Sequence, residues 1–390
     1  SPRSRRTLTT EIPEPVLRDL PEAEVLLSNQ ARPALDALSA EGGFRLLEER
    51  RSQVVYRLGR SLTVLYDCLL EDPSGQRKRQ SVALTAGPKA PTGGATIEGG
   101  GFELRGWVYP HDPALPGLAM WFEEENRRVL LSAIGLDEGG TLRARSYRPG
   151  RRAVLELNFS DRRVFVKAVR PSRVGDLQER HRLLADRMPV PKSLGWLPDD
   201  GVVVMEGLPG QPMSSGGSAP DAAALESLLG LVPPTEYVVS PLRRRSRGHA
   251  DRLKAILPTA SDRIEELAGR LAGIEPDTQV PAHGDFHAGQ VIVDGDVVVG
   301  LIDVDTVGMG ERADDLATMI GHLHVMALGG RASHAGLAER LLAGFERSHG
   351  DLRPRIAAAV LGYASGPWIR QEPDWQTSAL QRLDAAEAWL

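Results

Sequence analysis

Residues 283–305 read HGDFHAGQVIVDGDVVVGLIDVD. The apolar runs on either side of the Asp-Gly pair at 294–295 predict a β-hairpin, because Asp-Gly is favoured in two-residue hairpin turns. Folding this hairpin brings together Asp285 in the preceding loop, the amide of Gln290 and Asp303 at the end of the second strand. The spacing therefore predicts a site built from two carboxylates and one amide.

This combination of side chains suits phosphoryl transfer from a nucleoside triphosphate. Asp285 would orient an acceptor hydroxyl or accept its proton, and Gln290 and Asp303 would hold Mg²⁺ against the phosphates. We therefore predict ATP or GTP and Mg²⁺ as cofactors. Three neighbouring residues are further candidates for the site: His283, His287 and Asp305.

The motif resembles that of a known superfamily. His283-Gly284-Asp285, then His287, then Ile302-Asp303 at a strand end are similar to the pattern of the aminoglycoside phosphotransferase and choline kinase superfamily, which shares the protein-kinase fold. The resemblance covers about residues 142–390. Gln290 departs from the family pattern, which has Asn there. A similar Gln in maltokinases and glucosamine kinases favours a sugar or aminosugar acceptor.

Two further family features have counterparts in the chain. Lys167 lies in the apolar run 164–169 and resembles the third-strand lysine of kinases, which contacts the phosphates and pairs with a helix glutamate. Glu179, on the helix expected from about residue 176, is the predicted partner. Asp315 matches the family aspartate after the metal site and is expected to brace the catalytic loop.

The resemblance also places the rest of the nucleotide site. The segment 148–151, Arg-Pro-Gly-Arg, stands where kinases have a glycine-rich phosphate loop, and Arg148 is expected to touch phosphate. The strand 202–205 leads into the expected hinge between two lobes. Backbone groups of Glu206 and Leu208 would bind the nucleotide base there.

The acceptor site is expected near the C-terminus, where related kinases complete the substrate pocket. Trp368, Arg370 and Glu372 combine aromatic and polar groups that suit a sugar ring, although core packing of the tryptophan is an equally good interpretation. The acceptor is therefore predicted to be a small molecule with a hydroxyl group.

Composition narrows the class of protein. The 390 residues carry a formal net charge of -5, which argues against a general nucleic-acid binder, because such proteins carry an excess of Lys and Arg. Cys68 is the only cysteine, which favours a reducing, cytoplasmic compartment. No apolar run approaches the roughly 20 residues of a membrane span. We expect a monomer or homodimer without membrane or nucleic-acid partners.

The chain texture predicts a β-rich front half and a helical back half. The resemblance implies an α+β, two-lobed fold of the protein-kinase type with an N-terminal extension. We assign residues 1–95 to an N-terminal cap or extension, 96–206 to a β-rich N-lobe and 207–390 to a helical C-lobe. The Gly- and Pro-rich segment 88–101 is the predicted linker.

Three other functions remain open at this point. An aminoglycoside antibiotic phosphotransferase is the second choice of acceptor. A non-catalytic nucleotide-binding regulator is suggested by Gln290 and the single glycine in the phosphate loop. A metal-dependent hydrolase is a third alternative, since His283, Asp285 and His287 alternate along an extended segment and His322 and His324 follow.

Overall fold

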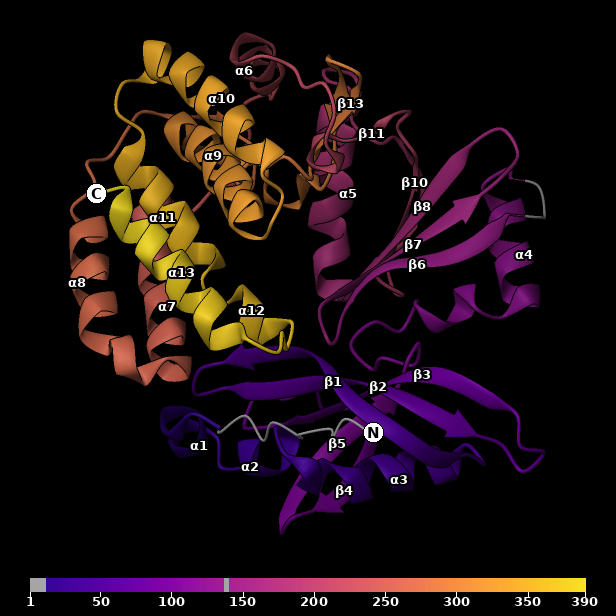
Figure 1. Cartoon of the computed structure of the whole chain (residues 1–390). Coiled ribbons are helices and arrows are strands. Elements are labelled where there is room, and N and C mark those ends of the chain that lie inside the picture. The colour runs from indigo at the N-terminus through magenta and orange to yellow at the C-terminus, as the bar shows by residue number, and fades with distance from the viewer. Residues whose placement is uncertain (1–11, 137–139) are drawn as a thin grey trace, which may run out of the picture.

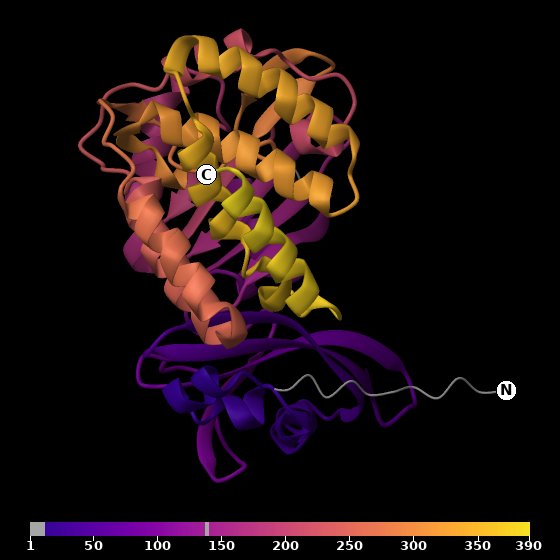
Figure 2. The same cartoon turned by 60° about the vertical axis from the view of Figure 1, so that its left-hand side comes forward.

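The computed structural model describes residues 12–136 and 140–390. Its first part is a five-stranded antiparallel sheet in the order β1-β2-β3-β5-β4, covered on one face by short helices. Figures 1 and 2 show these helices on the face that points away from the rest of the molecule. The elements are α1 (Glu14–Asp19), α2 (Ala23–Leu26), α3 (Arg32–Glu41), β1 (Arg45–Arg57), β2 (Ser61–Glu71), β3 (Arg77–Ala86), β4 (Ala95–Gly99) and β5 (Phe102–Val108).

The second part is another five-stranded antiparallel sheet, in the order β6-β7-β8-β10-β9. The tight turn at Gly150, where φ is 66°, joins β6 to β7 and forms the expected phosphate-loop position. Helix α5 packs on the sheet through Val174 and Leu177, which contact Val203 and Met205. The elements are α4 (Glu124–Ala133), β6 (Thr141–Arg148), β7 (Arg152–Asn158), β8 (Arg163–Val169), α5 (Pro171–Ala185), β9 (Ser193–Leu197) and β10 (Val202–Glu206).

The third part is mainly helical and carries the predicted hairpin as β13 and β14, which pair around Asp294. Two small sheets, β11-β13-β14 and β12-β15, hold the loops of the site. The strands are β11 (Gln211–Pro212), β12 (Gln279–Ala282), β13 (Val291–Asp294), β14 (Val297–Leu301) and β15 (Gly308–Glu311). The helices are α6 (Ala222–Gly230), α7 (Leu242–Ile256), α8 (Ser261–Ala272), α9 (Arg312–Leu328), α10 (Ser333–His349), α11 (Arg353–Tyr363), α12 (Gly366–Ile369) and α13 (Trp375–Ala388), with a 3-10 turn, η5 (Val304–Thr306).

The first sheet lies across the ends of both lobes (Figures 1 and 2). Toward the helical lobe, Tyr56 packs edge-on against Trp368, and Arg51 Nε donates to Gln371 Oε1 at 3.1 Å. Toward the second sheet, Trp107 Nε1 donates to the hydroxyl of Tyr147 at 2.8 Å. The extension is therefore packed against each lobe.

The boundary expected at 95/96 cuts the first sheet and is corrected here. β5 pairs with both β3 and β4, so residues 95–108 belong to the extension, and the linker expected at 88–101 contains β4. The Gly and Pro residues of this segment do not prevent strand pairing, because Gly94 and Gly99–Gly101 lie at the ends of β4, outside its central pairs. The boundary at 206/207 coincides with the end of β10.

The expected fold class is confirmed: an α+β chain with a β-rich lobe, a helical lobe and an N-terminal extension. Within residues 12–136 and 140–390, none of the helices combines the length and the apolar character that a membrane span requires.

Candidate active site

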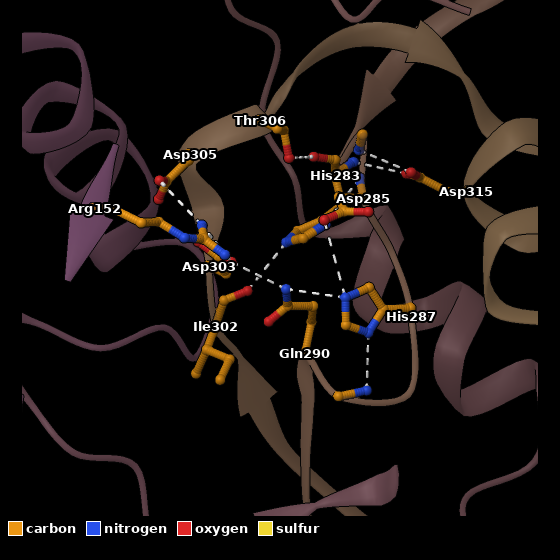
Figure 3. Close-up of polar contacts among 12 residues, drawn as sticks. Arg152, His283, Asp285, His287, Gln290, Ile302, Asp303, Asp305, Thr306 and Asp315 are labelled. Atoms are coloured by element: carbon orange, nitrogen blue, oxygen red, sulfur yellow. Dashed lines mark hydrogen bonds and ion pairs between the residues drawn. The ribbon is translucent and has the colours of Figure 1, made fainter. Parts of the chain in front are cut away.

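The catalytic loop that precedes β13 is fixed by buried hydrogen bonds (Figure 3). Backbone N–H groups of His283 and Gly284 donate to the two carboxylate oxygens of Asp315 at 2.7 and 2.8 Å, and Thr306 Oγ1 donates to the carbonyl of His283 at 2.8 Å. Gly284 has φ +83°, and a Cβ there would lie 2.8 Å from the Thr306 carbonyl, so the position requires glycine. Asp315 thus braces the loop, as predicted.

His283 is fully buried and has a structural environment. Its Nδ1 accepts the N–H of Asp285 at 3.4 Å, so the neutral ring carries its proton on Nε2, 3.1 Å from the Ile302 carbonyl that accepts it. The ring therefore ties the catalytic loop to the end of the hairpin. Among the residues that the structure describes, the Asp285 carboxylate has only His287 nearby as a polar partner, at 3.9 Å, and its side chain is 46% exposed and opens to a cavity.

Asp303 follows β14 in the left-handed backbone region, with φ 58°, and its carboxylate accepts three different donors. Lys167 Nζ lies 2.6 Å from Oδ1, Arg152 Nη1 lies 3.1 Å from Oδ2, and Gln290 Nε2 lies 3.1 Å from Oδ2. Lys167 also pairs with Asp305. Burial acts to raise the pKa of Asp303, but Lys167 and Arg152 hold it well below its usual range. The carboxylate is therefore charged at neutral pH.

His287 connects Asp285 to Gln290. Burial lowers the pKa of His287 to about 4, so the ring is neutral at neutral pH. The N–H of Gly289 donates to its Nδ1 at 3.1 Å, which leaves the proton on Nε2, 3.2 Å from the Gln290 amide and 3.9 Å from the Asp285 carboxylate. A protonated Nε2 needs an acceptor, and a half turn of the Gln290 amide supplies its oxygen.

This arrangement fits a magnesium ion. The half turn would place the Gln290 oxygen beside the Asp303 carboxylate, where the amide nitrogen now lies at 3.1 Å. Two adjacent oxygens need a cation between them, and carboxylate and amide oxygens are the ligands that Mg²⁺ accepts. Asp305 offers a further carboxylate next to them. The predicted metal residues are therefore brought together with a donor set suited to the ion.

A largely apolar cavity of about 270 Å³ lies between the two lobes, and its lining includes Lys167, Gln290 and Asp303. Leu208 lines it, as expected for a base-binding residue. Its apolar lining comes from the second sheet and from the hairpin of the helical lobe: Val154, Phe165, Met205, Ile292 and Ile302. Polar side chains also line it: Arg145, Ser146, Arg152, Arg163 and His181. The shape and lining suit a nucleotide base with its phosphates toward Lys167.

Two predicted nucleotide contacts need correction. Glu179 does not pair with Lys167: it is exposed and pairs with Arg182 one turn along α5, at 2.6 Å, because the face of α5 that carries Val174, Leu177 and His181 is the one packed inward. Glu206 is exposed and does not line the base cavity, and its N–H donates to the Lys192 carbonyl at 2.9 Å.

Of the three acceptor candidates near the C-terminus, one lies in the core and two line a cavity. Trp368 is 3% exposed and packs against Tyr56 of the extension, so the core interpretation of this tryptophan holds. Arg370 and Glu372 form an ion pair and line a cavity of about 790 Å³ that also includes His287. Arg148 lines this cavity as well as the one beside Asp285, rather than the base cavity.

Arg152 and Arg57 are site residues that the sequence did not reveal. Arg152 contacts Asp303, and Arg57 of β1 lines the cavity beside Asp285. Arg152 could have been predicted from the sequence, because it is the first residue of the strand after the phosphate-loop turn and faces the same side as Val154. Arg57 had none, since it lies more than 200 positions before the catalytic motif.

The alternative of a histidine-based metal centre finds no support in the geometry. Among residues 12–136 and 140–390, no three His, Cys, Asp or Glu side chains are grouped as metal ligands. His322 stacks on His287 with ring centroids 4.4 Å apart, and His324 packs against Trp389 instead.

The part of the chain that holds these residues matches a known family. A family model described as the phosphotransferase enzyme family matches residues 149–358, which include Lys167, Asp285, Gln290 and Asp303. A sequence comparison with curated proteins gives no match.

Solved structures with a similar fold include several antibiotic phosphotransferases. The macrolide 2'-phosphotransferase type I is 18% identical, with a TM-score of 0.45, covering 66% of this chain and 96% of that one. Macrolide 2'-phosphotransferase MphH from Brachybacterium faecium is 21% identical, with a TM-score of 0.42, covering 67% and 97%. A thermostable mutant of aminoglycoside phosphotransferase APH(4)-Ia, in ternary complex with ADP and hygromycin B, is 13% identical, with a TM-score of 0.48, covering 67% and 97%.

The family match spans more than half of the chain and contains every residue of the convergent cluster of Lys167, Gln290 and Asp303. The expected enzyme class, a phosphotransferase with a hydroxyl acceptor, is the class of this family. The chain belongs to the phosphotransferase enzyme family.

Proposed function

We propose that this protein transfers the γ-phosphoryl group of ATP or GTP to a hydroxyl group of a sugar or aminosugar. One observation carries the proposal: Lys167 and Gln290 both contact Asp303, all three line the base cavity, and Gln290 also lines the cavity that holds Asp285. A nucleotide in the first cavity would therefore direct its terminal phosphate toward the carboxylate in the second.

Asp285 is the group that handles the proton. The acceptor hydroxyl oxygen forms a bond to the γ-phosphorus while the bond from that phosphorus to the β-γ bridging oxygen breaks, and the hydroxyl proton passes to an Asp285 carboxylate oxygen. The partial exposure of Asp285 leaves its carboxylate accessible to the acceptor. No covalent enzyme intermediate is needed.

Lys167 and Arg152 supply fixed positive charge beside the phosphates, since both already contact the Asp303 carboxylate at the end of the base cavity. Gln290, Asp303 and Asp305 would hold Mg²⁺, which neutralises phosphate charge when it is bound. His287 acts through Gln290, because its Nε2 faces the amide.

The test is ADP release against a panel of neutral sugars, aminosugars, sugar acids, sugar phosphates, amino alcohols and aminoglycosides, with phosphorus NMR of the product. We expect one compound class to be phosphorylated and Asp303→Ala to lose turnover by orders of magnitude. Circular dichroism should show that this variant stays folded. Full turnover in the variant, or nucleotide binding without ADP release on every compound, would contradict the proposal, and the latter would support a non-catalytic regulator.

A further inference from the structure

The cavity beside Asp285 is lined by an unusual number of arginines. It measures about 520 Å³, and we name it the arginine cavity. Its arginines come from the extension, the phosphate-loop turn, the end of β8 and helix α5. They are Arg57, Arg148, Arg151, Arg152, Arg170, Arg173 and Arg180.

Most of this charge is not neutralised by the protein. Arg152 pairs with Asp303, but among residues 12–136 and 140–390 no ion pair joins a carboxylate to any of the other six. Arg170 and Arg180 donate to backbone carbonyls, of Gly150 and Val307, which carry no net charge. The cavity carboxylates are few: Asp176, Asp285 and Asp305, the last already bonded to Lys167. A chain of net charge -5 has therefore gathered uncompensated positive charge at one place.

The arginines of the cavity also repel one another. Partial burial, together with the charges of Arg148 and Arg57, lowers the pKa of Arg151 to about 10. Burial likewise lowers the pKa of Arg57, with Arg170 as the next contribution. Such repulsion is relieved when an anion binds, because each guanidinium gains an oppositely charged partner.

A triphosphate alone does not account for this set. The base cavity and the arginine cavity share only Arg152 and Gln290, so the phosphates enter next to Arg152. Among the described residues that line the base cavity, neither Arg57 nor Arg173 is included. Arg57 and Arg173 are therefore available to bind a second anion in the cavity that Asp285 also lines.

The neighbouring cavity around His287 has the same electrostatic character. Arg331, Arg370 and Arg382 line it, and Glu372 is its only carboxylate among the described residues, already paired with Arg370. A cationic acceptor would therefore meet positive charge on both sides of Asp285.

We propose that the acceptor is a sugar that carries an anionic group, a phosphate or a carboxylate, and that the arginine cavity holds this group. Arg57 from the N-terminal sheet then completes the acceptor site, which gives the extension a direct part in substrate binding. This inference rests on the proposed kinase function and narrows its acceptor. Guanidinium groups suit both phosphate and carboxylate, because each presents paired oxygens to their N–H groups.

Calorimetric titration of the full chain without nucleotide tests the charge of the acceptor. The probes are glucose, glucosamine, kanamycin, glucuronate, glucose 1-phosphate and glucose 6-phosphate. We expect at least about 10-fold tighter binding of one anionic probe than of glucose at low salt, weakening as salt is raised. The preferred anion separates a phosphate from a carboxylate. Tighter binding of glucosamine or kanamycin would overturn the inference, while ADP release with either would leave the proposed kinase function standing. Tight anion binding with no ADP release on any probe would instead count against the kinase function alone.

Arg57→Gln tests the part played by the extension, with Arg60→Gln as its matched control. Both are arginines at the β1–β2 turn, but Arg60 is exposed and does not line the cavity. We expect Arg57→Gln to weaken binding of the anionic probe about 10-fold and to leave KM for ATP within about 2-fold, and Arg60→Gln to change neither. Arg173→Gln, on α5, repeats the test without altering the first sheet. An increase in KM for ATP equal to the loss of probe affinity would show that these arginines serve the triphosphate, and the inference would be wrong.

Discussion

The hydroxyl of Tyr147 joins the N-terminal sheet to the phosphate-loop turn, and its removal gives a quantitative test of that connection. It accepts from Trp107 Nε1 and donates to Asp112 Oδ2, each at 2.8 Å. Both partners are buried, 3% and 2% exposed. Burial and the Asp112 carboxylate raise the pKa of the Tyr147 phenol far above its usual value, so the group remains a donor. The same carboxylate accepts the N–H of Gly150 at 2.7 Å.

Tyr147→Phe keeps the ring and removes both hydrogen bonds. The bond to a carboxylate contributes about 1.5 to 3 kcal/mol and the neutral bond about 0.5 to 1.5 kcal/mol, so the free energy of unfolding should fall by about 2 to 4.5 kcal/mol. Tyr109→Phe is the matched control. Its ring packs on Tyr147 with centroids 4.8 Å apart, but its buried hydroxyl has no hydrogen-bond partner among the described residues. Removing it should cost less than about 0.5 kcal/mol.

Urea denaturation, followed by circular dichroism and by tryptophan fluorescence, measures the difference between the two variants. A steady-state assay adds KM for the nucleotide, which should rise only in Tyr147→Phe, because Asp112 then holds Gly150 less firmly. Equal loss of stability in the two variants would refute the reasoning, since it would show that the hydroxyl contacts contribute nothing beyond ring packing.

Three further predictions follow from other sites. Asp285→Asn should lower kcat about 10²- to 10⁴-fold with an unchanged melting temperature, and retention of kcat would remove this residue from the reaction. Arg355→Met should cost about 3 to 5 kcal/mol in urea denaturation, because it leaves buried Asp314 without its ion pair and buried Glu311 with Arg243 only; a loss under 1 kcal/mol would contradict this. Burial lowers the pKa of His249 from 6.5 to about 4, so the folded state keeps the ring neutral while the unfolded chain takes up a proton. Its contribution to stability, up to about 3 kcal/mol, is present above pH 6.5 and lost as the pH falls toward 4. His249→Phe should therefore reduce the drop in melting temperature between pH 7 and pH 5, and an unchanged drop would disprove the assignment.

The parts of the site that local sequence determines were predictable. The hairpin around Asp294 and the placement of Gln290 and Asp303 follow from strand alternation and a turn signal within about 20 residues. Lys167 was identifiable because it is the only lysine in a strongly apolar strand. Asp315 was identifiable because it matches the aspartate that follows the metal site in the family pattern.

The errors arose where tertiary packing chooses between equal local options. Glu179 has an arginine three residues later on its own helix, and the rotation of α5 that buries Leu177 turns the glutamate outward. Residues 95–99 are flanked by glycines and prolines that favour turns, yet they pair with β5. Arg57 lines the cavity beside Asp285 because the first sheet packs against the lobes. A short-range sequence pattern does not predict this packing.

The packing of the first sheet against both lobes has a mechanical consequence. Trp107 contacts the β-rich lobe, Tyr56 packs against Trp368 of α12, and Arg51 donates to Gln371, two residues after α12. Two lobes joined only by a hinge could rotate relative to each other. Here the first sheet contacts both lobes and restrains that rotation. Any widening of the gap that admits a nucleotide must break one of these two sets of contacts or bend the sheet between β5 and β1. Entry of the nucleotide and exit of the product are thus mechanically linked to a segment outside the catalytic lobes.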